Sequence, residues 1–268
     1  MSNDKNFLRI LLFSLILFLI TLNAMVLPII VGPEASDLTA TLVFFLSFIV
    51  YWVTISYFLS WEGSGERIES LGFEWDNKSM SHITIGAIAG IFSAALVILF
   101  AVAFGGDLRP PSQITEDLIL SEIIITTPVA FFEELAYRGY LMTRMEKSFG
   151  KNIAIIASSI VFSLLHFSWW TKIAPSELYL IGIFSLNMFI GGVVLGYSYY
   201  LSGRKLWVPI AFHFSWNFMA YILFPEFPNV PVTNPALYQI EWGITTIFGF
   251  LFGLSILYLL LTNNKKKK

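Results

Sequence analysis

Residues 8–31 decide the class of fold, because they read LRILLFSLILFLITLNAMVLPIIV and carry a single charged side chain, that of Arg9. A run of this length crosses a hydrocarbon core about 30 Å thick as an α-helix. Similar runs recur along the chain, and we predict eight membrane-spanning helices. They lie at about 8–31, 38–61, 81–104, 118–143, 152–170, 177–201, 207–224 and 240–262, and the fourth is expected to remain helical to about Gly150.

The composition agrees with a membrane protein. Of the 268 residues, 56% are hydrophobic and only 13% are charged, whereas a soluble domain carries about 25% charged residues. The net charge of −2 offers no basic surface for nucleic acid. The absence of cysteine excludes disulfides, thiolate nucleophiles and cysteine-ligated metals. We therefore expect an all-α integral membrane protein that forms one transmembrane domain over residues 1–268, with the lipid bilayer as its surroundings.

Lysine and arginine sort strongly between the two sides of this topology. With both termini cytoplasmic, 14 of the 16 basic residues fall on the cytoplasmic side, and only Arg109 and Lys172 fall outside. The polar stretch 62–80 is expected to be a cytoplasmic interfacial segment. The four C-terminal lysines at 265–268 are expected to bind anionic headgroups.

Besides Glu122 near its outer end, the fourth predicted span contains three charged side chains close together, where charge is costly and usually functional. They belong to the sequence Phe-Phe-Glu-Glu-Leu-Ala-Tyr-Arg at 131–138. Glu134 and Arg138 are four residues apart, so they share a helix face and can neutralise each other. Glu133 points about 100° away from Glu134, and therefore needs another partner.

The tetrapeptide His-Phe-Ser-Trp occurs twice, beginning at His166 and at His213. The two copies lie in predicted spans that run in the same direction, which favours two imidazoles at one site. Asn217 follows His213 by four residues and shares its helix face. The copies differ at their ends, because Trp170 stands where the second copy has Asn217.

The spacing also predicts a common depth. Glu133 lies 17 residues before Gly150 and His166 lies 16 residues after it, so an antiparallel helix pair would bring them to one level, about 25 Å from the tip at Gly150. His213 lies about 13 Å from the turn at Arg204. These depths agree if the first hairpin protrudes by about two turns, which predicts a site within the membrane and nearer the cytoplasmic face.

Each of these residues taken alone could have a structural role, as a packed histidine or a helix–helix hydrogen bond. Together they support amide hydrolysis, in which a carboxylate beside an imidazole activates water and an imidazole with a carboxamide stabilises an oxyanion. Zinc bound by Glu133, His166 and His213 is an alternative, although the sequence lacks His-Glu-x-x-His. A proton-coupled transporter is a further alternative.

The motifs Glu133-Glu134-x-x-x-Arg138, Phe162-x-x-x-His166 and His213-x-x-x-Asn217, in this order, resemble the CPBP family. This family, also called ABI, comprises CAAX prenyl proteases and bacteriocin-processing or immunity proteins. The resemblance covers about residues 118–224, which we interpret as the catalytic core.

The resemblance implies an endopeptidase that removes the last three residues of a prenylated Cys-a-a-X protein. Glu133 and His166 would activate water, His213 and Asn217 would stabilise the oxyanion, and Glu134 and Arg138 would support the site. This mechanism requires no cofactor, with zinc as the open alternative. The substrate would be a peptide or prenylated protein C-terminus.

A family member without prenyl substrates, acting in peptide processing or bacteriocin immunity, is the alternative within the family. The plasma membrane of a prokaryote is the favoured location, with the endoplasmic reticulum if the source is eukaryotic. The sequence gives no oligomeric state.

Overall fold

The computed structural model describes residues 3–32, 34–63 and 65–266, and every regular element within them is helical. The expectation of an all-α fold is confirmed. Lys267 and Lys268 lie outside the described residues, so headgroup binding by the C-terminal lysines stays a prediction. The long helices are α1 (Asn3–Val31), α2 (Ser36–Glu62), α3 (Ser79–Phe104), α4 (Glu116–Glu134), α6 (Lys151–Leu164), α7 (Tyr179–Leu201), α8 (Trp207–Leu223) and α10 (Thr245–Lys266).

Shorter elements complete the chain. After α4 the helix continues without a break through the π-helical segment η3 (Leu135–Leu141) into α5 (Met142–Phe149), and it ends at Gly150 as predicted. The remaining elements are short, and they are η1 (Ile68–Leu71), η2 (Pro111–Gln113), η4 (Phe167–Lys172), η5 (Pro175–Glu177) and α9 (Pro235–Tyr238).

Six helical segments of the described chain are long and apolar enough to cross a membrane: Lys5–Val31, Ser36–Glu62, Ser79–Phe104, Lys151–Lys172, Tyr179–Leu201 and Thr245–Asn263. The other two predicted spans correspond to α4 and α8. Helix α4 begins and ends with pairs of acidic residues, and α8 has only 17 residues. The protein is thus a multi-pass membrane protein, whereas the count of eight spans stays a prediction.

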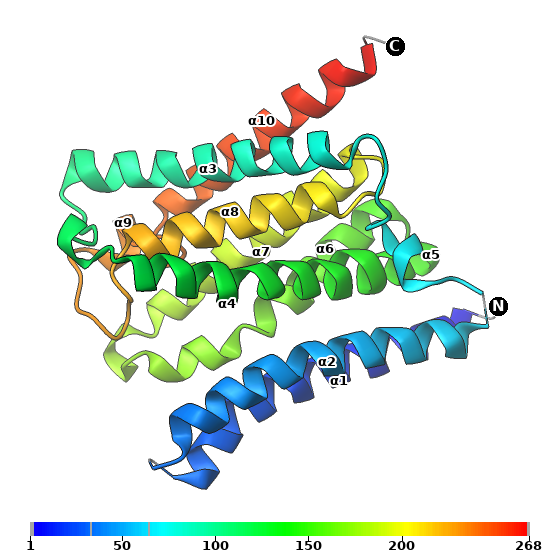
Figure 1. Cartoon of the computed structure of the whole chain (residues 1–268), viewed down its shortest axis with the longest axis horizontal. Coiled ribbons are helices and arrows are strands. Elements are labelled where there is room, and N and C mark those ends of the chain that lie inside the picture. The colour runs from blue at the N-terminus through cyan, green and yellow to red at the C-terminus, as the bar shows by residue number, and fades with distance from the viewer. Residues whose placement is uncertain (1–2, 33, 64, 267–268) are drawn as a thin grey trace.

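The long helices run back and forth between two ends of the molecule (Figure 1). The start of α1 and the end of α10 lie at the right-hand end in this view, together with the α2–α3, α5–α6 and α7–α8 connections. We call this the polar end and define it as residues 62–79, 142–151 and 202–206. The alternating direction of the long helices agrees with the predicted topology. The cytoplasmic location of the polar end stays a prediction.

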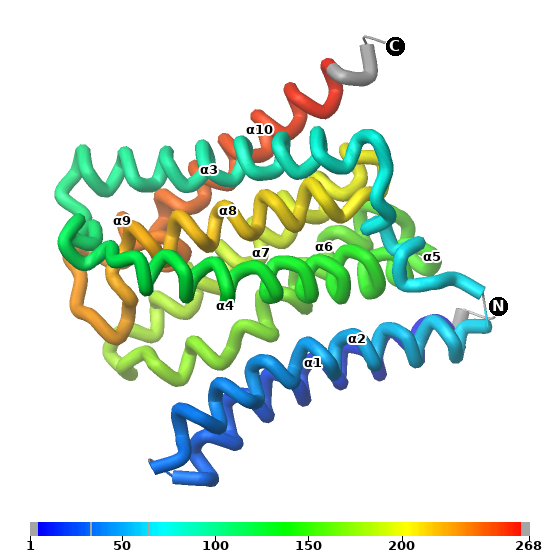
Figure 2. The backbone as a smooth tube through the Cα atoms, viewed as in Figure 1, coloured from blue at the N-terminus to red at the C-terminus, as the bar shows by residue number. Residues whose placement is uncertain are grey.

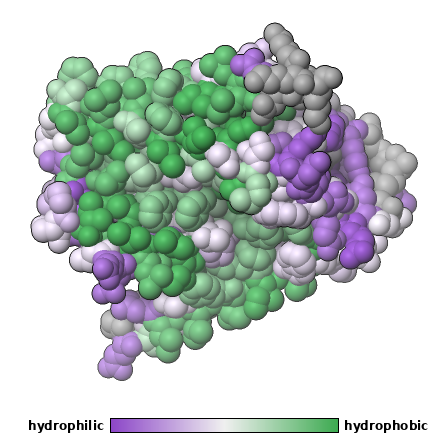
Figure 3. Space-filling view, turned by 45° about the horizontal axis from the view of Figure 1, so that its top comes forward, coloured by the Kyte–Doolittle hydropathy of each residue, from purple (hydrophilic) through white to green (hydrophobic). Residues whose placement is uncertain are grey.

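Apolar side chains cover most of the face shown in Figure 3, and hydrophilic side chains gather at its right-hand end. Large residues that a soluble protein would bury are exposed on the outer helices, among them Ile29, Leu38 and Val102 with 73%, 66% and 63% of their surface accessible. Apolar surface of this extent marks contact with another apolar phase. A bilayer around the helices supplies that phase.

Two predicted spans differ from the observed helices. Helix α6 ends at Leu164, and His166 lies in a turn before the 3₁₀ helix η4. The last span begins at Thr245, because residues 239–244 form a loop held by the carboxamide of Asn187, whose Nδ2 donates to the carbonyl oxygens of Glu241 and Gly243 at 2.8 and 3.0 Å. Apolar composition alone did not separate these segments from the spans beside them.

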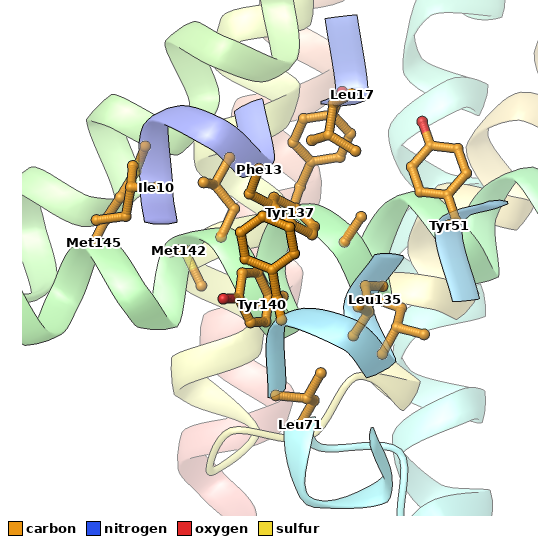
Figure 4. Close-up of a cluster of buried hydrophobic side chains, with 14 of the residues drawn as sticks. Ile10, Phe13, Leu17, Tyr51, Leu71, Leu135, Tyr137, Tyr140, Met142 and Met145 are labelled. Atoms are coloured by element: carbon orange, nitrogen blue, oxygen red, sulfur yellow. The ribbon is translucent and has the colours of Figure 1, made fainter. Parts of the chain in front are cut away.

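The hairpin of α1 and α2 packs against the C-terminal part of the α4–η3–α5 helix, over η3 and α5, near the polar end (Figure 4). Phe13 and Tyr140 are fully buried there, with ring centroids 4.4 Å apart. Away from this contact the hairpin diverges from the other helices toward the left-hand end of Figure 2. The hairpin is therefore fixed at one end of the molecule, which matters for the cavity described next.

Helix α8, which carries His213, is fixed by close approach of α3. A Cβ atom at Gly86 would lie 2.3 Å from the carbonyl oxygen of Val208, and one at Gly90 would lie 2.6 Å from that of Phe212. Small residues four apart allow helix backbones in membranes to approach this closely. The glycine pair therefore sets the position of His213 relative to the rest of the bundle.

Candidate active site

A central cavity of about 1020 Å³ lies between the α1–α2 hairpin and helices α4, α7 and α8. It is lined by Glu133, His166, His213 and Asn217. The structure thus brings together at one cavity four side chains that the sequence analysis singled out. It does so from three separate parts of the chain, namely α4, the turn after α6, and α8.

Glu134 and Arg138 lie beside this cavity rather than in it. Both are buried, and the Arg138 Nη1 donates to Glu134 Oε1 at 2.8 Å. Arg138 Nη2 also donates to the carbonyl oxygen of Gly192 at 3.3 Å, and its guanidinium lies over the ring of Phe162 at 4.4 Å. The predicted i, i+4 ion pair therefore exists, and it ties α4 to α6 and α7.

His213 contacts both glutamates. Its Nδ1 lies 2.9 Å from Glu134 Oε1, and its Nε2 lies 3.9 Å from Glu133 Oε2. The first distance is a hydrogen bond and the second is too long for one. If Glu134 is ionised it can only accept, so the Nδ1 of His213 carries a proton. This hydrogen bond fixes the orientation of the His213 ring, so that its Nε2 lies on the side of Glu133.

His166 is held through the same ring nitrogen, but by a backbone carbonyl. Its Nδ1 lies 2.7 Å from the carbonyl oxygen of Phe162, one turn earlier in the chain. A carbonyl oxygen can only accept a hydrogen bond, so this nitrogen must carry the proton. In the neutral ring Nε2 is then an acceptor. The turn at the end of α6, which the sequence did not predict, sets this ring orientation.

Glu133 retains hydrogen-bonding capacity. Its Oε2 is buried and has no hydrogen-bond partner among the described residues. Buried acceptors without partners are rare in native proteins and are often found at reactive sites. Among the described residues no hydrogen bond or ion pair joins Glu133 to His166, although both side chains line the cavity.

No group of three or more His, Asp or Glu side chains within the described part of the chain is placed to hold a metal ion. Glu133, His166 and His213, which are the ligands of the zinc alternative, line one cavity. Both the metal-free mechanism and the zinc alternative stay predictions.

One further acidic residue lines the cavity. Glu241 lies in the loop between α9 and α10 with a φ of +67°. Its backbone is fixed by the Asn187 hydrogen bond and by its own N–H, which donates to Thr246 Oγ1 at 2.9 Å. The predicted last span, 240–262, includes Glu241, which the sequence prediction did not select as a site residue. An ionisable residue inside a predicted span is costly, and this cost could have identified Glu241 as a candidate.

Residues 115–219 match the family model described as "Type II CAAX prenyl endopeptidase Rce1-like". No curated protein matches the chain. The matched segment contains all six site residues and agrees with the core of 118–224 that the resemblance covers. The resemblance inferred from the three motifs is confirmed.

Proposed function

Because residues 115–219 place the chain in the CPBP family of CAAX proteases, we propose that the protein is an intramembrane endopeptidase that removes the last three residues of a prenylated Cys-a-a-X sequence. The observation that carries the proposal is the unsatisfied carboxylate oxygen of Glu133. Its Oε2 is buried without a hydrogen-bond partner, in a cavity that is also lined by His166 and His213.

The mechanism starts with a water molecule between Glu133 and His166. Two acceptors that face the same space can orient the water and take one of its protons. The hydroxide attacks the scissile carbonyl carbon, and the carbonyl oxygen becomes an oxyanion. The proton then passes to the leaving amine as the carbon–nitrogen bond breaks. The sum of the steps is hydrolysis, and it requires no cofactor.

Stabilisation of the oxyanion falls to α8. His213 and Asn217 lie one turn apart and line the same cavity, and in this mechanism the imidazole and the carboxamide donate to the oxyanion. Donors fixed in advance at the developing charge are among the largest contributions to catalysis. Glu134 and Arg138 act as positioning residues, because they hold the His213 ring.

A cleavage assay tests the proposal. Purified protein in lipid nanodiscs is incubated with a farnesylated Cys-a-a-X peptide, and mass spectrometry follows loss of the C-terminal tripeptide. The matched control is the same peptide without the prenyl group. We expect cleavage of the prenylated peptide, no cleavage by the Glu133→Gln variant, and full activity after chelation of metals. Cleavage by Glu133→Gln at the normal rate would sink this mechanism.

One observation favours a second candidate, peptide processing without prenyl substrates. Among the described residues, the cavity lining includes none from the polar end, but it does include Arg109, Lys172 and Glu226 from the opposite end. If the basic polar end is cytoplasmic, as its lysines and arginines favour, the cavity opens toward the outer side of a prokaryotic plasma membrane. A substrate from that side would not be a cytosolic prenylated protein.

The two candidates differ in the side of the membrane toward which the cavity opens. Because the chain has no cysteine, one cysteine can be introduced at exposed Ser176, in η5 at the end opposite the polar end, or at exposed Ser70, in the polar end. Labelling intact cells with a membrane-impermeant maleimide reports which end faces outward. Labelling at Ser176→Cys alone supports the second candidate, and labelling at Ser70→Cys alone supports the first.

A further inference from the structure

The central cavity continues from the catalytic residues along η4. Its lining includes His166, Ser168, Trp169, Thr171 and Lys172, so it follows this 3₁₀ helix from its first turn to its last residue. A 3₁₀ helix rises about 2 Å per residue, which places the backbone of Lys172 about 12 Å from that of His166. Lys172 therefore marks a fixed distance from the bond that would be cleaved.

The side-chain ammonium of Lys172 is available to bind an anionic ligand. Its Nζ lies 4.4 Å from the centroid of the Trp169 ring, one turn earlier in η4. Within the described residues no carboxylate forms an ion pair with it. The stacked Trp169 restrains the ammonium without neutralising it.

The other cation of the lining, Arg109, is engaged differently. Its Nε donates to the carbonyl oxygen of Ile222 at 3.1 Å, and its Nη2 donates to those of Tyr221 and Phe224 at 3.2 Å. The carbonyl groups of Tyr221 and Ile222 belong to the last turn of α8, where they lack partners within the helix, and Phe224 follows directly after the helix. Arg109 therefore serves to end α8, which leaves Lys172 as the lining cation available to a ligand.

We propose that Lys172 binds the C-terminal carboxylate of the substrate peptide and thereby sets how many residues are removed. Three residues in extended conformation span about 10 Å, which matches the distance from His166 to Lys172 within the reach of a lysine side chain. This inference rests on the proposed endopeptidase function, and it holds for a prenylated or an unprenylated C-terminus. The carboxylate forms an ion pair with the ammonium over Trp169.

The test compares two peptides that differ only at their C-terminus, one with a free carboxylate and one with a carboxamide. For the unchanged protein we expect a KM roughly fivefold lower for the acid, in the range of a partly exposed ion pair, with a similar kcat. Lys172→Gln removes this preference, and Lys172→Glu reverses it. The ratio is taken within each variant, so partial unfolding of a variant affects both peptides equally.

Lys151→Gln is the matched control. Lys151 also lies over an aromatic ring, with its Nζ 4.7 Å from the centroid of Tyr200, but it belongs to the polar end, away from the cavity. This variant should keep the preference for the acid. Loss of the preference in Lys151→Gln, or its retention in Lys172→Gln, contradicts the assignment.

Binding measurements separate this inference from the proposed function. Fluorescent acid and amide peptides are titrated against the Glu133→Gln variant and against Glu133→Gln/Lys172→Gln. Tighter binding of the acid that depends on Lys172, without cleavage by the unchanged protein, supports the carboxylate site and rejects the endopeptidase. Cleavage and binding that are equal for acid and amide leave the endopeptidase intact and reject the site.

Discussion

Buried charges at the polar end and at the central cavity use the same residue types and are paired very differently. At the polar end, Arg144 donates to both oxygens of Glu62 at 2.8–3.1 Å, and Tyr140 donates to Glu62 at 2.7 Å. At the cavity, Arg138 pairs with one oxygen of Glu134, and the second oxygen of Glu134 and one oxygen of Glu133 have no partner within the described chain.

This difference in pairing indicates the role of the charges at each of the two places. The free-energy cost of removing two charges from water is offset only when hydrogen bonds satisfy the remaining lone pairs. The polar end meets that condition and serves to join α2, the α2–α3 segment and α5. The cavity does not meet it, and the unsatisfied carboxylate oxygen of Glu133 is the group to which we assign the chemistry. The four predictions below test this division, from the largest expected effect to the smallest.

Glu133→Gln should have the largest effect. The amide keeps the size of the side chain but cannot accept a proton, so the cleavage rate should fall about 10² to 10⁴-fold. Thermal unfolding should be almost unchanged, because Oε2 makes no hydrogen bond that the fold would lose. Turnover and unfolding temperature, measured on one preparation, check both parts. A large loss of stability would reassign Glu133 to the fold.

Arg138→Gln should mainly lower the free energy of unfolding. It leaves buried Glu134 without its cation, and breaking one side of a buried pair costs about 3–5 kcal/mol. Glu134→Leu/Arg138→Met removes both charges and should recover much of that loss while staying inactive, because His213 loses its anchor. Denaturant unfolding followed by tryptophan fluorescence measures the difference. A double variant no more stable than Arg138→Gln would contradict the pairing argument.

Asn217→Ala should lower the cleavage rate about 10² to 10³-fold, the effect expected for loss of one oxyanion donor. KM should change little, because the donor acts mainly on the transition state. Asn229→Ala, at an exposed position outside the cavity, is the control and should leave kcat unchanged. An Asn217→Ala variant altered only in KM would assign the carboxamide to substrate binding instead.

Glu66→Gln at the polar end should have the smallest effect, below about 1 kcal/mol, because its side chain is 34% exposed. Burial alone would raise the pKa of the Glu66 carboxyl, but the charge and hydrogen bond of Arg144, and those of Lys147, outweigh it and hold the pKa below its ordinary value. Its stabilisation is then present above the ordinary pKa of 4.5 and is lost as the pH falls through the folded-state value.

The pH dependence of unfolding checks this sign. The unchanged protein should lose stability relative to Glu66→Gln as the pH is lowered from about 4.5, and the two should keep a constant difference near pH 7. An unfolding curve in which the two proteins differ by the same amount at every pH would show that Glu66 does not titrate with folding.

Much of the fold follows from sequence because its signals are local. Apolar runs located the long helices, and the i, i+4 spacing located the Glu134–Arg138 pair. The convergence of Glu133, His166 and His213 followed from counting residues from the hairpin tip. These inferences needed only the regular rise of a helix.

What the sequence did not reveal depends on contacts between distant segments. The Glu134–His213 hydrogen bond joins residues 79 positions apart, and the sequence analysis had paired His213 with Asn217 alone. The turn that orients His166 interrupts an otherwise uniform apolar run. The loop that carries Glu241 is defined by the side chain of Asn187 from another helix. Hydropathy carries no information about such contacts.

The π-helical segment η3 separates the two kinds of charge along one continuous helix. Glu133 and Glu134 lie before Leu135–Leu141, and Arg144 lies after it. Each added or removed residue rotates the following part of a helix by about 100°. A single deletion within η3 would therefore turn Arg144 away from Glu62 while leaving Glu133 at the cavity and Glu134 beside it. The angular relation between the catalytic half and the anchoring half of this helix thus depends on the length of one seven-residue segment.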